Sequence, residues 1–375
     1  MRLTFKELKD EIAKIVPKSI DYKVGLEAGN IAIITNEPEK FGGGDGLVGK
    51  IAKKIKRKIK IRPDPSIVKP QQEAKSIIES VIPEEAEISQ IYFDACFSEV
   101  IIQCQNPGEA VGRRGANVNE IRNKTGWIPK VERTPPIFSK SVHDVRSYRN
   151  SIADERKKLL KDFGLNIHRP KRPRSTWVRI TALGSYREVG RACHLVTTNE
   201  SRVMVDVGVN IASDTDPMPY FTAPEALPLE KLDAVVLTHS HLDHAGMLPV
   251  LFKYGYRGPV YCTPPTRDLM LLLQTDYIKV GGAEGKRPAY DMEDIRTCMK
   301  HVVDVEWGET TDITPDIKLT MSNAGHILGS SALHMHVADG KHNIVFSGDQ
   351  KYEKSWLFDA ANTRFPKVET LIIES

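Results

Sequence analysis

Three histidines and an aspartate lie within six residues in the second half of the chain, in the pattern His-x-His-x-Asp-His. They are His239, His241, Asp243 and His244. An apolar run with strand character, residues 232–237, comes directly before them. A strand that ends in such a loop presents several imidazoles at one edge of a sheet, and neutral imidazole and carboxylate are ligands for zinc. The spacing therefore predicts a metal site, and the alternative is a polar loop whose histidines only form hydrogen bonds.

Further candidate ligands come from other segments, as a two-metal site requires. His326 is flanked by glycines in Asn-Ala-Gly-His-Ile-Leu-Gly, as a ligand in a tight turn would be. Asp349 ends the apolar run of residues 344–349, and Asp206 ends a strand-like run that begins at residue 202. Either His326 or Asp349 alone could be a structural residue. His194, His334 and His336 lie in strand patterns and are interpreted as structural or packing residues.

Length and composition indicate a globular protein with more than one domain. The chain has 375 residues, of which 40% are hydrophobic and 27% are charged. Two or three domains are expected at this length. No apolar run reaches the roughly 18 residues that cross a bilayer, so we expect no membrane association. Five scattered cysteines without a Cys-x-x-Cys pair are typical of a reducing cytosol, and we expect a cytoplasmic protein.

Positive charge is concentrated before the histidine motif. Residues 1–70 carry 16 basic and 9 acidic side chains, and residues 146–175 carry 10 and 3. Residues 176–375 carry 19 basic and 26 acidic side chains. This asymmetry indicates that a polyanion is bound by the first part of the chain and reacts in the second. The alternative is that the lysine runs are solvated helix faces.

The first part of the chain contains two copies of one pattern, which resembles the KH RNA-binding module. In residues 71–142, a helix over 73–82 and a strand from Val100 precede a Gly-x-x-Gly turn. This turn consists of Gly112, Arg113, Arg114 and Gly115. Glycines let the backbone approach a nucleic-acid strand, and the arginines can contact its phosphates. The alternative is a KH fold that serves only as a spacer.

The copy in residues 1–70 has a less regular turn. A helix over residues 4–16 and a strand over 31–35 precede the glycine-rich segment 42–46, in which Asp45 would repel phosphate. The basic helix that follows carries Lys50, Lys53 and Lys54, which we expect to add salt-sensitive affinity for RNA. Because a helix comes first in each copy, both resemble the type II arrangement.

Residues 143–175 are predicted to connect these modules to the rest of the chain. An amphipathic helix is expected over residues 143–163, followed by a basic, proline-bounded linker that touches RNA or acts as a tether. Residues 176–375 begin with strand-rich patterns, and a helix is expected over 266–278.

The histidine motif and its later partners are similar to those of the metallo-β-lactamase superfamily. The resemblance implies an αββα sandwich, so the predicted fold class is α/β and α+β with several domains. It implies two zinc ions. Carried over residue by residue, His239, His241 and His326 would bind one zinc, Asp243 and His244 would bind the second, and Asp349 would bridge both. Asp206 would orient the histidine loop and act with Asp243 and Asp349 in catalysis.

The segment Ser-Gly-Asp-Gln-Lys-Tyr at residues 347–352 and the terminal Glu374 resemble the β-CASP nucleases of this superfamily. Together with KH modules, they resemble the archaeal cleavage and polyadenylation specificity factor proteins. Glu374 would be a further catalytic residue, and it would begin a motif that precedes an inserted domain carrying further histidines. Because the sequence stops at Ser375, we expect a truncated form, a segment of a longer protein, or one part of a split protein that a second chain completes.

The resemblance implies a zinc-dependent endoribonuclease that acts on single-stranded RNA in 3′-end formation or transcription termination. A 5′–3′ exonuclease activity is also known in the family. Implied partners are single-stranded RNA, the transcription machinery, and a second copy of the full-length chain in a homodimer. The competing hypotheses are a non-catalytic RNA-binding scaffold and a small-ester or thioester hydrolase. The second of these would leave the KH modules and the basic linker without a role.

Overall fold

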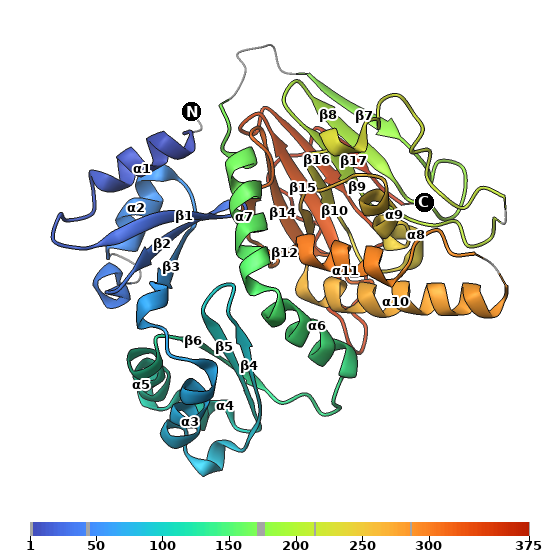
Figure 1. Ribbon diagram of the computed structural model, residues 1–375. Helices are drawn as coiled ribbons and strands as arrows, with labels where there is room; N and C mark the ends of the chain where they lie inside the picture. Colours follow the sequence, from blue (N-terminus) through green and yellow to red (C-terminus); the bar gives the residue numbers. More distant parts are fainter. Residues whose placement is uncertain (1–2, 43–45, 171–176, 214, 286, 375) are drawn as a thin grey trace. The chain divides into compact units, whose positions relative to one another are not determined.

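The computed structural model describes residues 3–42, 46–170, 177–213, 215–285 and 287–374 (Figure 1). The chain forms two compact units, residues 3–161 and residues 162–375. The first unit contains two small α/β modules, which we call the first module (residues 5–63) and the second module (residues 71–133). The boundary between the units falls within a helix, so each unit is described by itself.

The first module is a three-stranded sheet covered by helices. Its elements are α1 (Phe5–Ala13), β1 (Tyr22–Glu27), β2 (Asn30–Thr35), the 3-10 turn η1 (Pro38–Phe41), α2 (Leu47–Ile55) and β3 (Ile59–Pro63). The central strand β2 is antiparallel to β1 and parallel to β3. Thr4 and Glu7 form a capping box that starts α1. Leu8 and Ile12 of that helix are buried with Ile31 and Ile33 of β2 in one core.

The second module repeats this topology. Its elements are α3 (Gln71–Val81), η3 (Glu84–Ala86), β4 (Ile88–Asp94), β5 (Glu99–Cys104), α4 (Pro107–Val111), η4 (Arg113–Gly115), α5 (Ala116–Thr125) and β6 (Ile128–Arg133). β5 is antiparallel to β4 and parallel to β6. The identical pairing order in both modules, each beginning with a helix, confirms the predicted helix-first repeat.

The two modules are joined by polar contacts and close backbone packing around the 3-10 turn η2 (Pro65–Ile67). The buried guanidinium of Arg62 pairs with Glu27 of the first module at 2.7 Å and with Glu99 of the second at 2.8 Å. The indole N–H of Trp127 donates to the carbonyl of Lys69 at 2.9 Å. Gly126 ends α5 with a φ of 74°, directly against this connection. A Cβ at that position would lie 2.4 Å from the carbonyl oxygen of Ile67.

The substitution Gly126→Ala is therefore expected to destabilise the first unit. Both its positive φ and the Ile67 carbonyl oppose a methyl group, and we expect a loss of about 1–3 kcal/mol in the free energy of unfolding. Gly108→Ala is the matched control, because a Cβ at Gly108 meets nothing within 4 Å. Differential scanning calorimetry of both variants tests this, and an equal effect of the two substitutions would contradict it.

The helix predicted over residues 143–163 is instead two helices, α6 (Lys140–Ser151) and α7 (Ala153–Ile167). The break is at Ile152, and the hydroxyl of Ser151 donates to the carbonyl of Tyr148 just before it. Asp154 and Glu155 then favour a new helix N-terminus. Periodicity alone predicted a single helix, so this interpretation was wrong. Residues 171–176 of the predicted basic linker lie outside the described residues.

The described part of the second unit contains two facing sheets. The six-stranded sheet has the order β12-β11-β10-β9-β8-β7 and the five-stranded sheet the order β13-β14-β15-β16-β17. The strands of the first are β7 (Val178–Ala182), β8 (His194–Thr198), β9 (Arg202–Val205), β10 (Ala234–Val236), β11 (Val260–Cys262) and β12 (Val302–Asp304). Those of the second are β13 (Thr310–Asp312), β14 (Ile317–Asn323), β15 (Ser331–Val337), β16 (His342–Phe346) and β17 (Thr370–Ile372).

One hydrophobic core holds the two sheets face to face. It includes Val205 and Val236 of the first sheet and Leu319, Leu333 and Phe346 of the second. The helices α8 (Leu242–Ala245), α9 (Leu248–Lys253), α10 (Pro264–Ala283) and α11 (Met292–His301) connect the parallel strands and lie outside this sandwich (Figure 1). α10 extends the helix predicted over residues 266–278. No helix among the described residues is long and apolar enough to cross a membrane.

Candidate metal centre

The candidate ligands meet at one edge of the sandwich. β9 and β10 run parallel, so Asp206 after β9 and the histidine loop after β10 leave the sheet at the same edge. His326 lies in the turn between β14 and β15, and Asp349 follows β16. The chain thus brings residues separated by up to 143 positions into one cluster.

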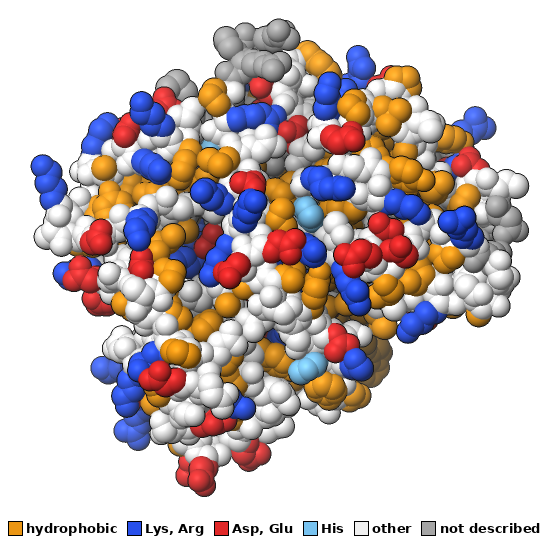
Figure 2. All heavy atoms as spheres, in the orientation of Figure 1, with side chains coloured by type: hydrophobic (Ala, Val, Ile, Leu, Met, Phe, Trp, Pro, Cys, Tyr) orange, Lys and Arg blue, Asp and Glu red, His pale blue; other side chains and the backbone are white. Residues whose placement is uncertain are grey.

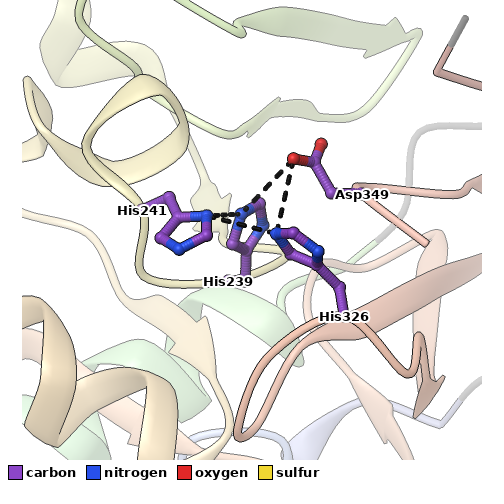
Figure 3. Close-up of side chains that lie close together, drawn as sticks. All are labelled: His239, His241, His326 and Asp349. Atoms are coloured by element: carbon purple, nitrogen blue, oxygen red, sulfur yellow. Dashed lines mark hydrogen bonds and ion pairs between the residues drawn. The ribbon is translucent and has the colours of Figure 1, made fainter. Parts of the chain in front are cut away.

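Four side chains form a first ligand group, and they point toward one another (Figure 3). Nδ1 of His241 lies 3.1 Å from Nε2 of His239 and 3.2 Å from Nε2 of His326. Oδ2 of Asp349 is 3.9 Å from Nε2 of His239 and 3.6 Å from Nε2 of His326. Three imidazole nitrogens and one carboxylate oxygen therefore converge in a small volume, which is a donor set that suits a divalent transition-metal ion.

A second ligand group shares Asp349 with the first. It consists of Asp243, His244 and Asp349. Nε2 of His244 lies 3.1 Å from Oδ1 of Asp349 and 3.9 Å from Oδ2 of Asp243. The two oxygens of Asp349 thus face different groups, an arrangement compatible with a carboxylate shared between two ligand sets.

Asp206 supports the cluster from behind. Its buried carboxylate accepts hydrogen bonds from the N–H and the hydroxyl of Thr238, at 2.7 and 2.8 Å. It also lies 2.9 Å from Nδ1 of His244, which leaves Nε2 of that ring directed at Asp349. Asp206 has a φ of 57°, in the left-handed region that aspartate adopts more often than most other residues. Sequence reasoning assigned the orienting role to Asp206 but missed Thr238, which lies next to His239 and carries no metal-binding side chain.

The electrostatics of the cluster keep two imidazoles neutral and the shared carboxylate ionised. Burial lowers the pKa of His239 and of His241, and neighbouring imidazoles lower both further. Burial alone would also lower the pKa of His244, but Asp206 and Asp349 raise it to about 10. Burial opposes ionisation of Asp349, yet the surrounding histidines hold the pKa of its carboxyl well below the usual range. Neutral imidazole and ionised carboxylate are the protonation states that bind metal, so His239, His241 and Asp349 already have them, whereas His244 must release a proton to become a ligand.

A close backbone approach fixes the turn that carries Asp243. The N–H of Ala192 donates to the carbonyl of Asp243 at 2.8 Å, and the N–H of Val207 donates to the carbonyl of His244 at 2.6 Å. Gly208 lies against the same turn, and a Cβ there would be only 1.6 Å from the carbonyl oxygen of Asp243. A side chain at residue 208 is therefore excluded. The Asp-Val-Gly sequence after β9 was the available signal for this contact, and sequence reasoning did not use it.

The remaining histidines lie outside both ligand groups. The ring of His194 packs between Tyr186 and Phe346. His334 contacts the carbonyl of Lys367, and His336 contacts the side chain of Asn343. Glu374 accepts a hydrogen bond from the N–H of Gln350, the residue after Asp349. Its own N–H donates to the hydroxyl of Ser347 at 3.1 Å, so Glu374 flanks the ligand turn.

The predicted RNA-binding arginines lie on an exposed turn in the second module. Gly112 and Gly115 have φ of 74° and 78°, and Arg114 between them has a φ of 54°. Neither Arg113 nor Arg114 forms an ion pair with a described residue, and both are exposed. Figure 2 shows basic side chains along the outer edge of this module, beside α5. The turn therefore presents two guanidinium groups without an ion pair among the described residues, and its two glycines leave the backbone open to a ligand.

The predicted RNA-binding lysines of the first module differ in their contacts with the rest of the protein. Lys50, Lys53 and Lys54 all lie on α2 and are exposed. Lys54 is 3.6 Å from the carboxylate of Glu11 on α1, so part of its charge is directed at the protein. Sequence periodicity did not reveal this pair. Residues 43–45 of the predicted turn, including Asp45, lie outside the described residues.

Metal analysis of purified variants tests the two ligand groups. We expect His239→Ala and Asp349→Ala to lower the bound divalent metal measured by inductively coupled plasma mass spectrometry. His336→Ala is the matched control, because it removes the second histidine of another His-x-His pair outside both groups. Equal metal content in His239→Ala and His336→Ala would contradict the assignment of the cluster.

Comparisons with known proteins agree with this architecture. A metallo-β-lactamase superfamily domain model matches residues 195–371, and a model of the KH domain of transcription termination factor FttA matches residues 2–68. The chain is 49% identical over 370 residues to transcription termination factor FttA of Methanosarcina mazei, covering 98% of this chain and 58% of that protein. It is 44% identical over 378 residues to FttA of Thermococcus kodakarensis, covering 99% of this chain and 58% of that protein.

Among solved structures, the metallo-β-lactamase fold protein YhfI of Bacillus subtilis covers 47% of this chain and 63% of its own. Its TM-score is 0.30 and its sequence identity 19%, a likeness on which we base no argument. The chain spans 58% of the length of the two curated relatives described above. The chain therefore combines a KH domain with a metallo-β-lactamase superfamily domain, and it is homologous along nearly its whole length to proteins named transcription termination factor FttA.

Proposed function

We propose that this chain provides the RNA-binding modules and the metal centre of a zinc-dependent endoribonuclease that acts in transcription termination and RNA 3′-end formation. The observation that carries the proposal is the pair of ligand groups that share Asp349, in one chain with two modules of KH topology. The curated relatives are named transcription termination factors, which supports the biological role. The activity of the longer protein is part of the same proposal.

The residues present fit two zinc ions. His239, His241 and His326 would hold one ion, Asp243 and His244 the other, and Asp349 would bridge them. When bound, a zinc pair polarises a phosphodiester and makes water a stronger nucleophile near neutral pH. Asp206 fixes the ring of His244, and the turn held by Ala192 and Val207 fixes Asp243. Glu374 adds a carboxylate beside the turn that carries Asp349.

The modules of the first unit would bind the single-stranded RNA. Arg113 and Arg114 would contact phosphates, while Gly112 and Gly115 let the strand approach the backbone. Lys50 and Lys53 would add non-specific affinity. We assign residues 1–70 and 71–142 to RNA binding, 143–175 to the connection between the modules and the metal domain, and 176–375 to the metal domain. We place the full-length protein in the cytoplasm as a homodimer that works with the transcription machinery.

Cleavage of end-labelled single-stranded RNA in the presence of zinc tests the catalytic part of the proposal. Asp349→Ala and Asp243→Ala are expected to lower the cleavage rate by about a hundredfold or more, because each removes a ligand. His336→Ala should retain the wild-type rate. Labels at the 5′ and 3′ ends separate internal cuts from 5′–3′ exonuclease action.

If the wild-type chain binds RNA without cutting it, the remainder of the length seen in the relatives is added as a second polypeptide. Cleavage restored in this way would keep the proposal. Continued inactivity with RNA bound and both metal ions present would favour the non-catalytic scaffold.

A separate measurement tests the RNA-binding turn. The double substitution Arg113→Ala with Arg114→Ala should weaken RNA binding about tenfold or more at moderate salt, and it should flatten the dependence of affinity on salt concentration. Fluorescence anisotropy with a labelled single strand gives both quantities. Lys75→Ala with Lys124→Ala removes the same charge from α3 and α5 of the same module and is the matched control. Equal losses in both double variants would contradict a specific role for the turn.

A further inference from the structure

A pocket of about 500 Å³ lies within the first unit, between its two modules. Residues from η1, β3 and η2 form one side, including Pro38, Ile61 and Ile67. The end of α5 and the start of β6 form the other side, with Arg122 and Ile128. This volume is within the range of roughly 300–1,000 Å³ found for small-molecule sites. Neither module contains the pocket by itself.

The lining combines an apolar floor with a polar rim. Ile61, Pro63 and Ile128 are partly or fully buried side chains that offer flat apolar contact. Asn123 and Glu39 are exposed on the rim. An apolar surface suits the face of a nucleobase, while amide and carboxylate groups can bind the donors and acceptors on its edge. A free phosphate would gain nothing from this floor.

Two side chains on the rim have no ion pair or hydrogen bond with another side chain in the described part of the chain. Arg122 forms no ion pair with a described residue, although its α5 neighbour Lys124 pairs with Glu120 at 2.6 Å. Asn123 likewise has no hydrogen-bond partner among the described residues. A cation and an amide that face an apolar pocket are suited to a phosphate and the base attached to it.

The walls of the pocket are held in place by the junction between the modules. Arg62 joins Glu27 to Glu99, Trp127 holds the carbonyl of Lys69, and Gly126 packs against Ile67. Because these contacts also position Ile67 and Ile128, the pocket exists before any ligand arrives. A preformed site loses less conformational entropy on binding than one that must be assembled.

We propose that this pocket binds one nucleotide of a single-stranded RNA, with the base on the apolar floor and its phosphate at Arg122. The inference rests on the proposed RNA substrate. It adds a nucleotide-binding site that is lined by residues of both modules. It differs from the Arg113 and Arg114 turn, since Asn123 and Glu39 would contact the base and so give a preference for its identity. The two modules would then bind one continuous strand.

Substitutions on α5 test the pocket through affinity. Arg122→Ala should weaken binding of single-stranded RNA about tenfold in fluorescence anisotropy, the loss of a charge-assisted contact. Lys124→Ala removes the same charge from the same helix outside the pocket and should change the affinity less than twofold or so. Both positions are exposed, so both variants are expected to fold.

Thiol protection tests occupancy directly. All five native cysteines are buried, so Asn123→Cys and Lys124→Cys each introduce one exposed thiol. RNA should slow the reaction of the Asn123→Cys thiol with a maleimide about tenfold and leave the Lys124→Cys thiol unchanged. An excess of uridine or adenosine 5′-monophosphate should not reproduce this protection. If the free nucleotides protect the Asn123→Cys thiol and RNA does not, the pocket is a mononucleotide site and the proposal is overturned.

The outcomes separate this proposal from the proposed function. One outcome is that the wild-type chain binds RNA, that Arg122→Ala and Lys124→Ala have the same RNA affinity, and that RNA protects neither thiol. In that case the pocket proposal fails, while RNA binding through the Arg113 and Arg114 turn stands. If the wild-type chain binds no RNA, the proposed function fails and the pocket proposal fails with it. Selective protection together with the Arg122→Ala loss supports the site.

Discussion

The metal centre depends on one carboxylate that is shared between two sets of ligands. Asp349 faces His239 and His326 with one oxygen and His244 with the other. The three imidazoles whose nitrogen atoms converge also contact one another, since Nδ1 of His241 lies within hydrogen-bond distance of both neighbouring rings. The rest of the second unit keeps this arrangement in place, because the two sheets that carry the ligands share one core. Asp206 and Thr238 then fix the ring orientations from behind.

Much of the centre was predictable because its chemistry is encoded locally. Four candidate ligands occupy residues 239–244, and the spacing of that motif requires no knowledge of tertiary contacts. His326 was found because glycines flank it as in a tight turn, and Asp349 because it ends an apolar run. The Gly-x-x-Gly turn around Arg113 was predicted for the same reason. Local patterns thus identified the side chains that do chemistry.

Other features depend on contacts that sequence periodicity does not encode. Sequence reasoning predicted neither β1, which is only six residues long and contains Gly25, nor β4, whose pairing with β5 is irregular between Ile88 and Gln90. The pair between Lys54 and Glu11 and the junction at Arg62 join residues far apart in the chain. The helix break at Ile152 follows a contact between the hydroxyl of Ser151 and the carbonyl of Tyr148. The pocket between the modules could be recognised only after both were placed.

Sharing Asp349 also links the occupancies of the two ligand groups. The first group brings three imidazoles of its own, whereas the second brings only Asp243 and His244. A cation in the first group therefore withdraws electron density from the carboxylate that the second depends on, and adds a positive charge beside it. If two ions bind as proposed, the second stepwise association constant is therefore expected to be the smaller. Singly loaded molecules would then dominate the protein population where free metal is scarce.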